Sequence, residues 1–182
     1  MPNWCSNSIT IEGPVDKIRA LWETVSSGSD ELGLLDAMYP MPKELHDTTK
    51  GSNGDDINWY DWRVNNWGTK WEVSSEGLEF IDNEQGRAMI TGWFESAWSP
   101  PIGAYERFCE ANEDCSLEAS YYEAGMDFAG FWKDGEDEFL ENLHDEYKKG
   151  DDACDLFQRL DDEYALSEQF AEWDEEYSDD GA

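Results

Sequence analysis

Apolar residues recur at every second position in several short stretches, which predicts β-strands. Ser8–Glu12 alternates in this way and is followed by Gly13 and Pro14, which predict a turn. Further strands are predicted at residues 77–81, 87–95, 115–122 and 126–132. The short apolar run 32–38, which ends before two prolines, is interpreted as one more strand.

Two stretches instead show the three- and four-residue spacing of an amphipathic helix. Val15–Val25 carries apolar residues at this spacing and directly follows Pro14, a favoured residue at a helix start. A second helix is predicted after the prolines at 100–101. The resulting order of elements predicts an α+β fold, a ferredoxin-like split β-α-β sheet with helices on one face, over residues 1–132.

Residues 133–182 show a different pattern. Apolar stripes at 137–149, 153–164 and 166–177 predict three amphipathic helices whose other positions are strongly acidic. We therefore expect an acidic, mostly helical C-terminal extension at 133–182, packed on the sheet or beside it.

Residues 59–71 hold four tryptophans together with Arg63 and Lys70, and they follow a polar, glycine-containing stretch at 43–58 that predicts a loop. Clustered tryptophans serve either as a structural core or as a binding surface. We assign the block mainly to the fold, with the two basic residues as internal counter-charges. A ligand cleft remains the alternative. It would use Arg63, Trp67, Lys70, Trp71 and Trp98.

Five short blocks occur in a characteristic order. They are PNWCSN at 2–7, PMP at 40–42, WYDWRVNNWGTKW at 59–71, FESAWSPP at 94–101 and EAGMDFAG at 123–130. In this order the chain resembles the YubB-type ferredoxin-like domain family of phage and conjugative-plasmid proteins, over about residues 1–132. The resemblance implies a ferredoxin-like domain without an iron–sulfur cluster, encoded on a mobile element. It supplies no catalytic residue, and the acidic extension lies outside it.

The formal net charge is −32, from 44 acidic and 12 basic residues. Direct binding to nucleic acid requires a basic surface, so this function is disfavoured. The chain has no apolar run long enough to span a membrane, and its first residues do not form a secretory signal. We therefore expect a protein of the host cell cytoplasm.

The sequence predicts neither a metal site nor a cofactor. The four cysteines are scattered without the C-x-x-C spacing of zinc or redox sites, and the acidic run 134–138 does not match a calcium-binding loop.

The sequence also predicts no enzyme and no catalytic residue. Four carboxylates adjoin aromatic residues, which can raise a carboxylate pKa, and His46 is a possible base. No nucleophile–base pair or catalytic motif accompanies them. The four carboxylates are Asp61, Glu72, Glu95 and Asp127.

Half of the net charge lies in the last 52 residues, from Phe131 to Ala182, which carry 20 acidic and 4 basic residues. Carboxylates spaced along helices resemble a row of phosphates, so this segment is predicted to imitate DNA and to bind a basic host protein, a nucleic-acid-binding or defence complex. The predicted contact residues are Asp151, Asp152, Asp155, Asp161, Asp162, Glu163, Glu168, Glu172, Trp173, Asp174, Glu175 and Glu176. Tyr164 and Tyr177 are expected to add aromatic contacts.

Two alternatives stay open. Strong acidity also serves solubility or adaptation to high salt without any target. The tryptophan block could instead form a small-ligand or enzymatic cleft, whose binding would depend little on salt. The sequence leaves the target and the oligomeric state undetermined.

Overall fold

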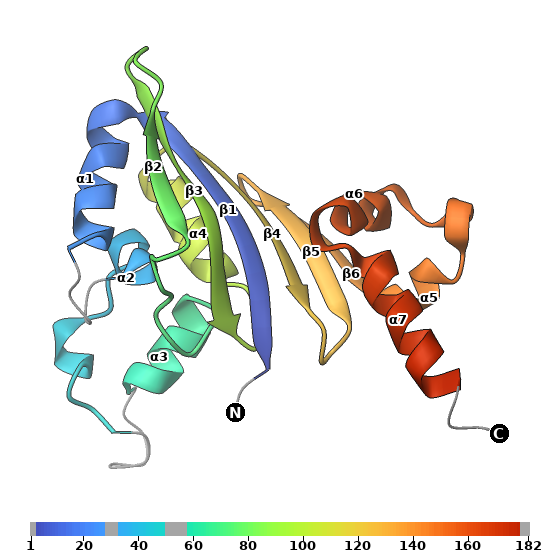
Figure 1. Ribbon diagram of the computed structural model, residues 1–182. Coiled ribbons are helices and arrows are strands. Elements are labelled where there is room, and N and C mark those ends of the chain that lie inside the picture. The colour runs from blue at the N-terminus through green and yellow to red at the C-terminus, as the bar shows by residue number, and fades with distance from the viewer. Residues whose placement is uncertain (1–2, 28–32, 50–57, 179–182) are drawn as a thin grey trace.

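The structure is a computed structural model, and it describes residues 3–27, 33–49 and 58–178. Its centre is a β-α-β-β-α-β unit with the antiparallel strand order β2-β3-β1-β4, which is the ferredoxin-like topology (Figure 1). The unit comprises β1 (Trp4–Pro14), α1 (Val15–Val25), β2 (Leu78–Asp82), β3 (Arg87–Ala97), α4 (Ile102–Ala111) and β4 (Ser116–Glu123). The predicted fold class is confirmed.

Two further strands widen the sheet beyond β4. β5 (Phe128–Lys133) pairs with β4, and β6 (Glu136–Glu141) pairs with β5. The helix predicted from residue 137 was therefore wrong over 137–141. Asp134 and Gly135 both have positive φ angles and form a two-residue hairpin loop, which favours strand pairing over a helix start. The domain boundary expected after residue 132 thus falls inside a β-hairpin.

The apolar run before the prolines forms α2 (Leu34–Met38), so the strand predicted at 32–38 was wrong. The Glu72 carboxylate explains the helix, because it accepts hydrogen bonds from the backbone N–H groups of Leu35 and Asp36 at 2.8 and 2.9 Å. A short 3₁₀ helix, η1 (Lys43–Leu45), and α3 (Trp59–Asn66) complete this side. Residue 32 of the predicted strand and residues 50–57 of the predicted loop lie outside the described residues.

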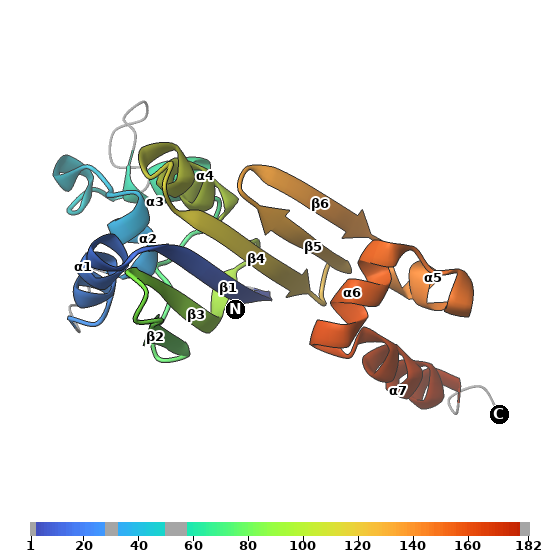
Figure 2. The same cartoon turned by 90° about the horizontal axis from the view of Figure 1, so that it is seen from above.

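The helices α1–α4 cover one face of the sheet (Figures 1 and 2). Along β1 the residues on this face are buried, while those on the other face are half-buried or exposed. Ile9 and Ile11 lie in the resulting core with Ile18 of α1 and Tyr105 of α4. The strict alternation of β1 therefore directs its apolar residues to α1 and α4.

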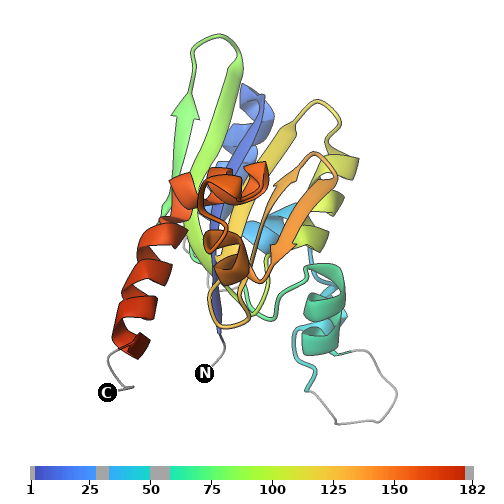
Figure 3. The same ribbon diagram turned by 90° about the vertical axis from the view of Figure 1, so that its right-hand side faces the viewer.

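The remaining helices lie on the opposite side of the sheet. They are α5 (Leu143–Tyr147), the 3₁₀ helix η2 (Gly150–Asp152), α6 (Asp155–Tyr164) and α7 (Leu166–Ser178). They form a second, smaller core around Phe157, Leu160 and Phe170, which packs on Tyr122 and Ala129 of the sheet. Figure 3 shows α6 and α7 in front of the sheet, while the upper part of the β2–β3 hairpin is uncovered by them.

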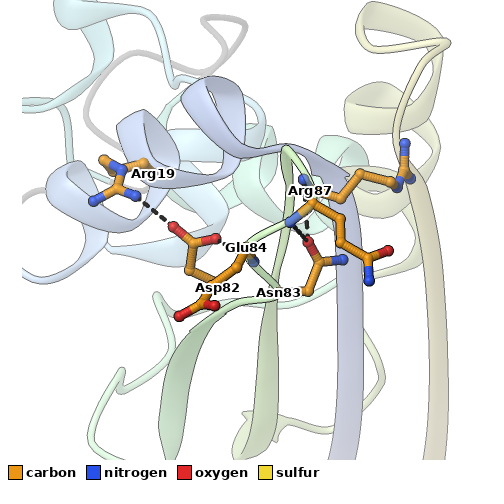
Figure 4. Close-up of polar contacts among 6 residues, drawn as sticks. Arg19, Asp82, Asn83, Glu84 and Arg87 are labelled. Atoms are coloured by element: carbon orange, nitrogen blue, oxygen red, sulfur yellow. Dashed lines mark hydrogen bonds and ion pairs between the residues drawn. The ribbon is translucent and has the colours of Figure 1, made fainter.

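The predicted turn between β2 and β3 is confirmed, and side-chain hydrogen bonds and an ion pair stabilise it (Figure 4). The Asn83 Oδ1 atom accepts hydrogen bonds from the backbone N–H groups of Gln85 and Arg87 at 3.1 and 3.2 Å. Asp82 forms an ion pair with Arg19 of α1 at 2.7 Å. This contact holds the edge strand β2 against α1.

Candidate functional site

Part of the tryptophan block belongs to the core. Asn58 caps α3 by accepting hydrogen bonds from the backbone N–H groups of Tyr60 and Asp61, both at 3.1 Å. The helix then buries Trp62 and, just after its last residue, Trp67, which is 0 % exposed. The Trp67 indole N–H donates to the Tyr39 carbonyl at 2.8 Å. This satisfied, fully enclosed side chain has a structural role.

Arg63 lies between this core and two carboxylates. Its guanidinium sits over the Trp67 ring at 4.7 Å, and burial lowers its pKa while Glu72 and Asp36 act in the opposite direction. Burial raises the pKa of Glu72 despite three backbone hydrogen bonds to its carboxylate. Arg63 thus lies within the electrostatic influence of both carboxylates, but among the described residues no ion pair joins its guanidinium to either of them.

Lys70 lies at the exposed side of the block. Its ammonium sits over the rings of Tyr60, Trp71 and Trp98 at 5.7, 4.5 and 5.5 Å. Trp98 is 39 % exposed and has a positive φ of 71°. Of the five residues of the alternative cleft, Trp67 is enclosed in the core, whereas Trp71 and Trp98 surround Lys70 nearer the surface.

Most of the predicted acidic contact residues are exposed. They are Asp151 and Asp152 in η2, Asp155, Asp162 and Glu163 in α6, and Glu168, Glu172, Glu175 and Glu176 in α7. We call these nine residues the acidic surface. Trp173 lies beside them and is 47 % exposed.

Two predicted contact residues have internal partners. Asp161 is half-buried, and its carboxylate accepts hydrogen bonds from the backbone N–H and the hydroxyl of Ser167, both at 2.6 Å, at the start of α7. Asp174 lies 2.9 Å from His144 Nε2, which joins α7 to α5. Both carboxylates help to position α7, so the exposed set is smaller than the sequence predicted.

Tyr164 is not an exposed aromatic contact as expected. Its hydroxyl lies 3.0 Å from Ser120 Oγ, and its ring meets Trp93 edge-on with centroids 5.7 Å apart. Burial raises its pKa. Tyr164 follows the apolar stripe of α6, which turns it towards the sheet. The side chain of Tyr177 lies outside the part of the chain that the structure describes.

Sequence reasoning missed the uncovered half of the sheet face opposite α1–α4. Trp93 of β3 is 48 % exposed there, and Ile81 of β2 is 39 % exposed. Beside Trp93 lies a groove of about 130 Å³ between the sheet and the end of α6, lined in part by Thr10, Glu118 and Glu163. The alternation of β3 contained the signal, because every second residue had to face away from the core.

The carboxylates that adjoin aromatic residues have plain structural partners. Asp61 accepts a hydrogen bond from the Asn58 side-chain amide at 2.6 Å, and Glu95 accepts one from the Ser6 hydroxyl at 2.8 Å. Asp127 Oδ2 lies 3.5 Å from the His144 backbone N–H, and Glu72 caps α2. Within the described ranges, no group of three His, Cys, Asp or Glu side chains is placed to hold a metal ion.

The fold and its exposed carboxylates define a ferredoxin-like α+β domain with an acidic helical face. A family model described as the ferredoxin-like domain in Api92-like protein matches residues 66–176, and the chain belongs to that family. The match includes residues 133–176, which the sequence resemblance had placed outside the family pattern. No curated protein matches the chain, and no solved structure does.

Among the residues that the structure describes, no helix is both long enough and apolar enough to cross a bilayer.

Proposed function

We propose that this chain is an accessory protein of a phage or another mobile element, and that it binds and blocks a basic, nucleic-acid-binding or defence protein of the host. Its acidic surface would occupy the groove that normally receives phosphates, by charge complementarity and without a chemical step. The site of action is the host cell cytoplasm.

The placement of the acidic surface carries this proposal. Residues 150–176 contain eleven acidic residues and one basic residue, Arg159. Arg159 forms an ion pair with Glu138 of β6 at 3.1 Å and lies over the Phe131 ring at 4.4 Å, so it is directed towards the sheet. The exposed side of α6 and α7 therefore presents carboxylates, and no ion pair in the described residues neutralises Glu168, Glu172, Glu175 or Glu176.

The arrangement within α7 favours a partner over mere solubility. Glu168, Glu172 and Glu176 follow one another at four-residue spacing, where like charges destabilise a helix by about 0.2–0.5 kcal/mol per pair. A solubilising charge can be placed anywhere on a surface, at no such cost. A row of carboxylates on one helix face instead attracts a basic groove and accelerates association.

Affinity capture from host lysate tests the proposal. The wild-type chain is compared with a variant in which the four α7 glutamates Glu168, Glu172, Glu175 and Glu176 are changed to Gln. The matched control carries the same number of exposed changes elsewhere in the chain: Glu23, Glu76, Glu106 and Glu113 to Gln. Each captured protein is then tested for displacement by duplex DNA.

We expect the wild type and the control to retain a nucleic-acid-binding protein that DNA displaces and that high salt releases. The α7 variant should retain at least ten times less of it, although its free energy of unfolding should rise by about 0.5–1 kcal/mol because the repulsion within α7 is removed. If the control retains equally little of this protein, capture depends on the overall acidity of the chain and not on α7. If both variants still retain the protein at high salt, the binding site lies elsewhere. The tryptophans around Lys70 would then be the next surface to test.

A further inference from the structure

The face of the sheet opposite α1–α4 carries an uncovered apolar strip. In antiparallel strands, directly opposed residues share a face. Trp93 opposes Ser8, Thr91 opposes Thr10, and Met89 opposes Ile81. A distance of 3.0 Å between the hydroxyls of Thr10 and Thr91 agrees with this register. We call Ile81, Met89, Thr91, Trp93 and Thr10 the open strip; each is half-buried or exposed.

A groove of about 130 Å³ lies beside this strip, at the C-terminal end of α6. Its lining includes four residues of the sheet: Ser8, Thr10, Ser120 and Phe131. Tyr164 contacts both Ser120 and the edge of Trp93, so the end of α6 forms a wall next to the exposed indole. The groove is too small for a folded element, and a single extended side chain is the occupant that suits its size.

Acidic residues border the groove and the strip. Glu163 lines the groove, is exposed, and has no ion pair within the described part of the chain. Glu118 lines it too and forms an ion pair with Lys133 at 3.0 Å. Glu79 is exposed and opposes Thr91, which places it on the same face as the strip. Two basic residues also lie near the groove, but each is paired with a carboxylate: Lys133 with Glu118, and Arg159, which lies over the Phe131 ring, with Glu138. The remaining acidic charge therefore favours a basic occupant and disfavours a second copy of this acidic chain.

We propose that the open strip and the adjoining groove anchor a basic segment of the partner protein. A lysine or arginine side chain of that segment enters the groove beside Glu163, and a neighbouring apolar side chain covers Trp93. This inference rests on the proposed function, because it supplies the anchor of an interface that the acidic surface only steers. A large aromatic side chain within a polar rim is the usual arrangement of a binding hot spot.

Binding of two peptide probes tests the inference at 150 mM salt. One is a twelve-residue peptide of alternating Lys and Leu, and the other a twelve-residue peptide of alternating Lys and Ser with the same charge. Dissociation constants are measured by fluorescence anisotropy of the labelled peptides with Trp93→Ala, Ile81→Thr, Glu163→Gln and the four-glutamate α7 variant. Trp98→Ala and Glu23→Gln are the matched controls, because Trp98 and Glu23 are also exposed but lie away from the groove.

We expect Trp93→Ala to weaken binding of the Lys–Leu peptide at least tenfold and binding of the Lys–Ser peptide less than twofold. Ile81→Thr should have a smaller effect of the same kind. Glu163→Gln should weaken both peptides three- to tenfold, and both controls less than twofold. The α7 variant should weaken both peptides similarly. Circular dichroism of each variant identifies any loss that comes from unfolding, and Ile81→Thr keeps the test valid if Trp93→Ala unfolds.

Three results would overturn the inference in distinguishable ways. If Trp93→Ala and Ile81→Thr match Trp98→Ala while the α7 variant weakens binding, the anchor is wrong and the proposed function stands. If neither these variants nor the α7 variant weakens either peptide, both proposals fail. If sedimentation shows self-association of the wild type that Trp93→Ala abolishes, the occupant of the strip is a second copy of the chain.

Discussion

The two helical layers of this protein differ in how they combine apolar and charged residues. On the α1–α4 side, 21 buried residues among those described form one core, and the half-buried Arg63 and Glu72 and the buried Asp36 are close enough to influence one another. On the α5–α7 side, eight buried residues within the described ranges form the core, while eleven of the residues at 150–176 are acidic. The first layer, α1–α4, buries the larger apolar core and therefore contributes more to stability. The second layer, α5–α7, has a small core and carries a row of carboxylates that repel one another.

This contrast bears on function because charge repulsion is retained where the stabilising core is smallest. A layer selected only for stability would replace some carboxylates of α7 by neutral residues of similar helix propensity. Substitutions at Trp67, His144 and Cys5 measure how independent the two layers are.

The largest effect is expected for Trp67→Ala. The side chain is fully buried and its indole N–H is satisfied, so truncation creates a large cavity and leaves the Tyr39 carbonyl unpaired. We expect the free energy of unfolding to fall by about 3–5 kcal/mol in a urea titration. Trp98→Ala, which removes a partly exposed ring, should cost less than about 1 kcal/mol.

Similar losses for both tryptophans would contradict the division of the block into a core part and a surface part. A small loss for Trp67→Ala would favour the ligand-cleft interpretation, because a side chain kept for binding tolerates truncation without unfolding.

The central ferredoxin-like unit was predictable because local signals and tertiary packing agree there. The alternation in β1 and the spacing in α1 each give the element that the structure shows, and α1 was predicted with the same bounds. The errors arose where a distant or very local contact decides the outcome. For the run before Pro40, the deciding group is Glu72, which is 37 residues from Leu35.

The C-terminal error had a local cause that the sequence does contain. Phe139, Leu140 and Leu143 fit a helical stripe, but the Asp134-Gly135 pair is a strong hairpin signal and placed 136–141 in a strand. The acidic surface was largely foreseen because it depends on composition and helical spacing. The open strip was missed. The alternation of β3 indicates that Trp93 faces away from the core, but only the strand register shows that it lies opposite Ser8, and only the packing places it next to Tyr164.

An intermediate effect, confined to the second layer, is expected for His144→Ala. The imidazole lies 2.9 Å from Asp174 and packs against the rings of Phe170 and Trp173, with centroids 5.1 and 5.2 Å away. Its removal should lower the free energy of opening of α7 by about 1–2 kcal/mol, which amide hydrogen exchange measures residue by residue.

Exchange in β1 should stay unchanged in this variant, and His46→Ala, which removes an exposed side chain, should alter neither element. Equal acceleration in α7 and β1 would show that the two layers unfold as one unit, and the contrast between them would then concern composition alone.

The smallest effect comes from Cys5, on the core side of β1. Burial raises the pKa of its thiol to about 12 from 9.0. Above pH 9 the unfolded chain therefore loses this proton while the folded chain keeps it, so the unfolded state binds fewer protons and stability falls as the pH rises. Between pH 9 and pH 10 this thiol should account for a loss of about 1 kcal/mol, and the loss should continue towards pH 12.

Urea titrations at pH 8, 9 and 10 measure this loss, and Cys5→Ala should remove its share of the slope whatever its own cost at pH 8. Cys154→Ala is the matched control, because that cysteine is exposed in the second layer and its removal should leave the slope unchanged. Burial also raises the pKa of Cys109 to about 11 and raises the pKa of Tyr105, so a residual loss of the same sign is expected from pH 9 upwards in every variant. If Cys5→Ala and Cys154→Ala lose stability equally between pH 9 and pH 10, the Cys5 thiol reaches solvent in the folded state, and the first layer is less tightly closed than its buried core indicates.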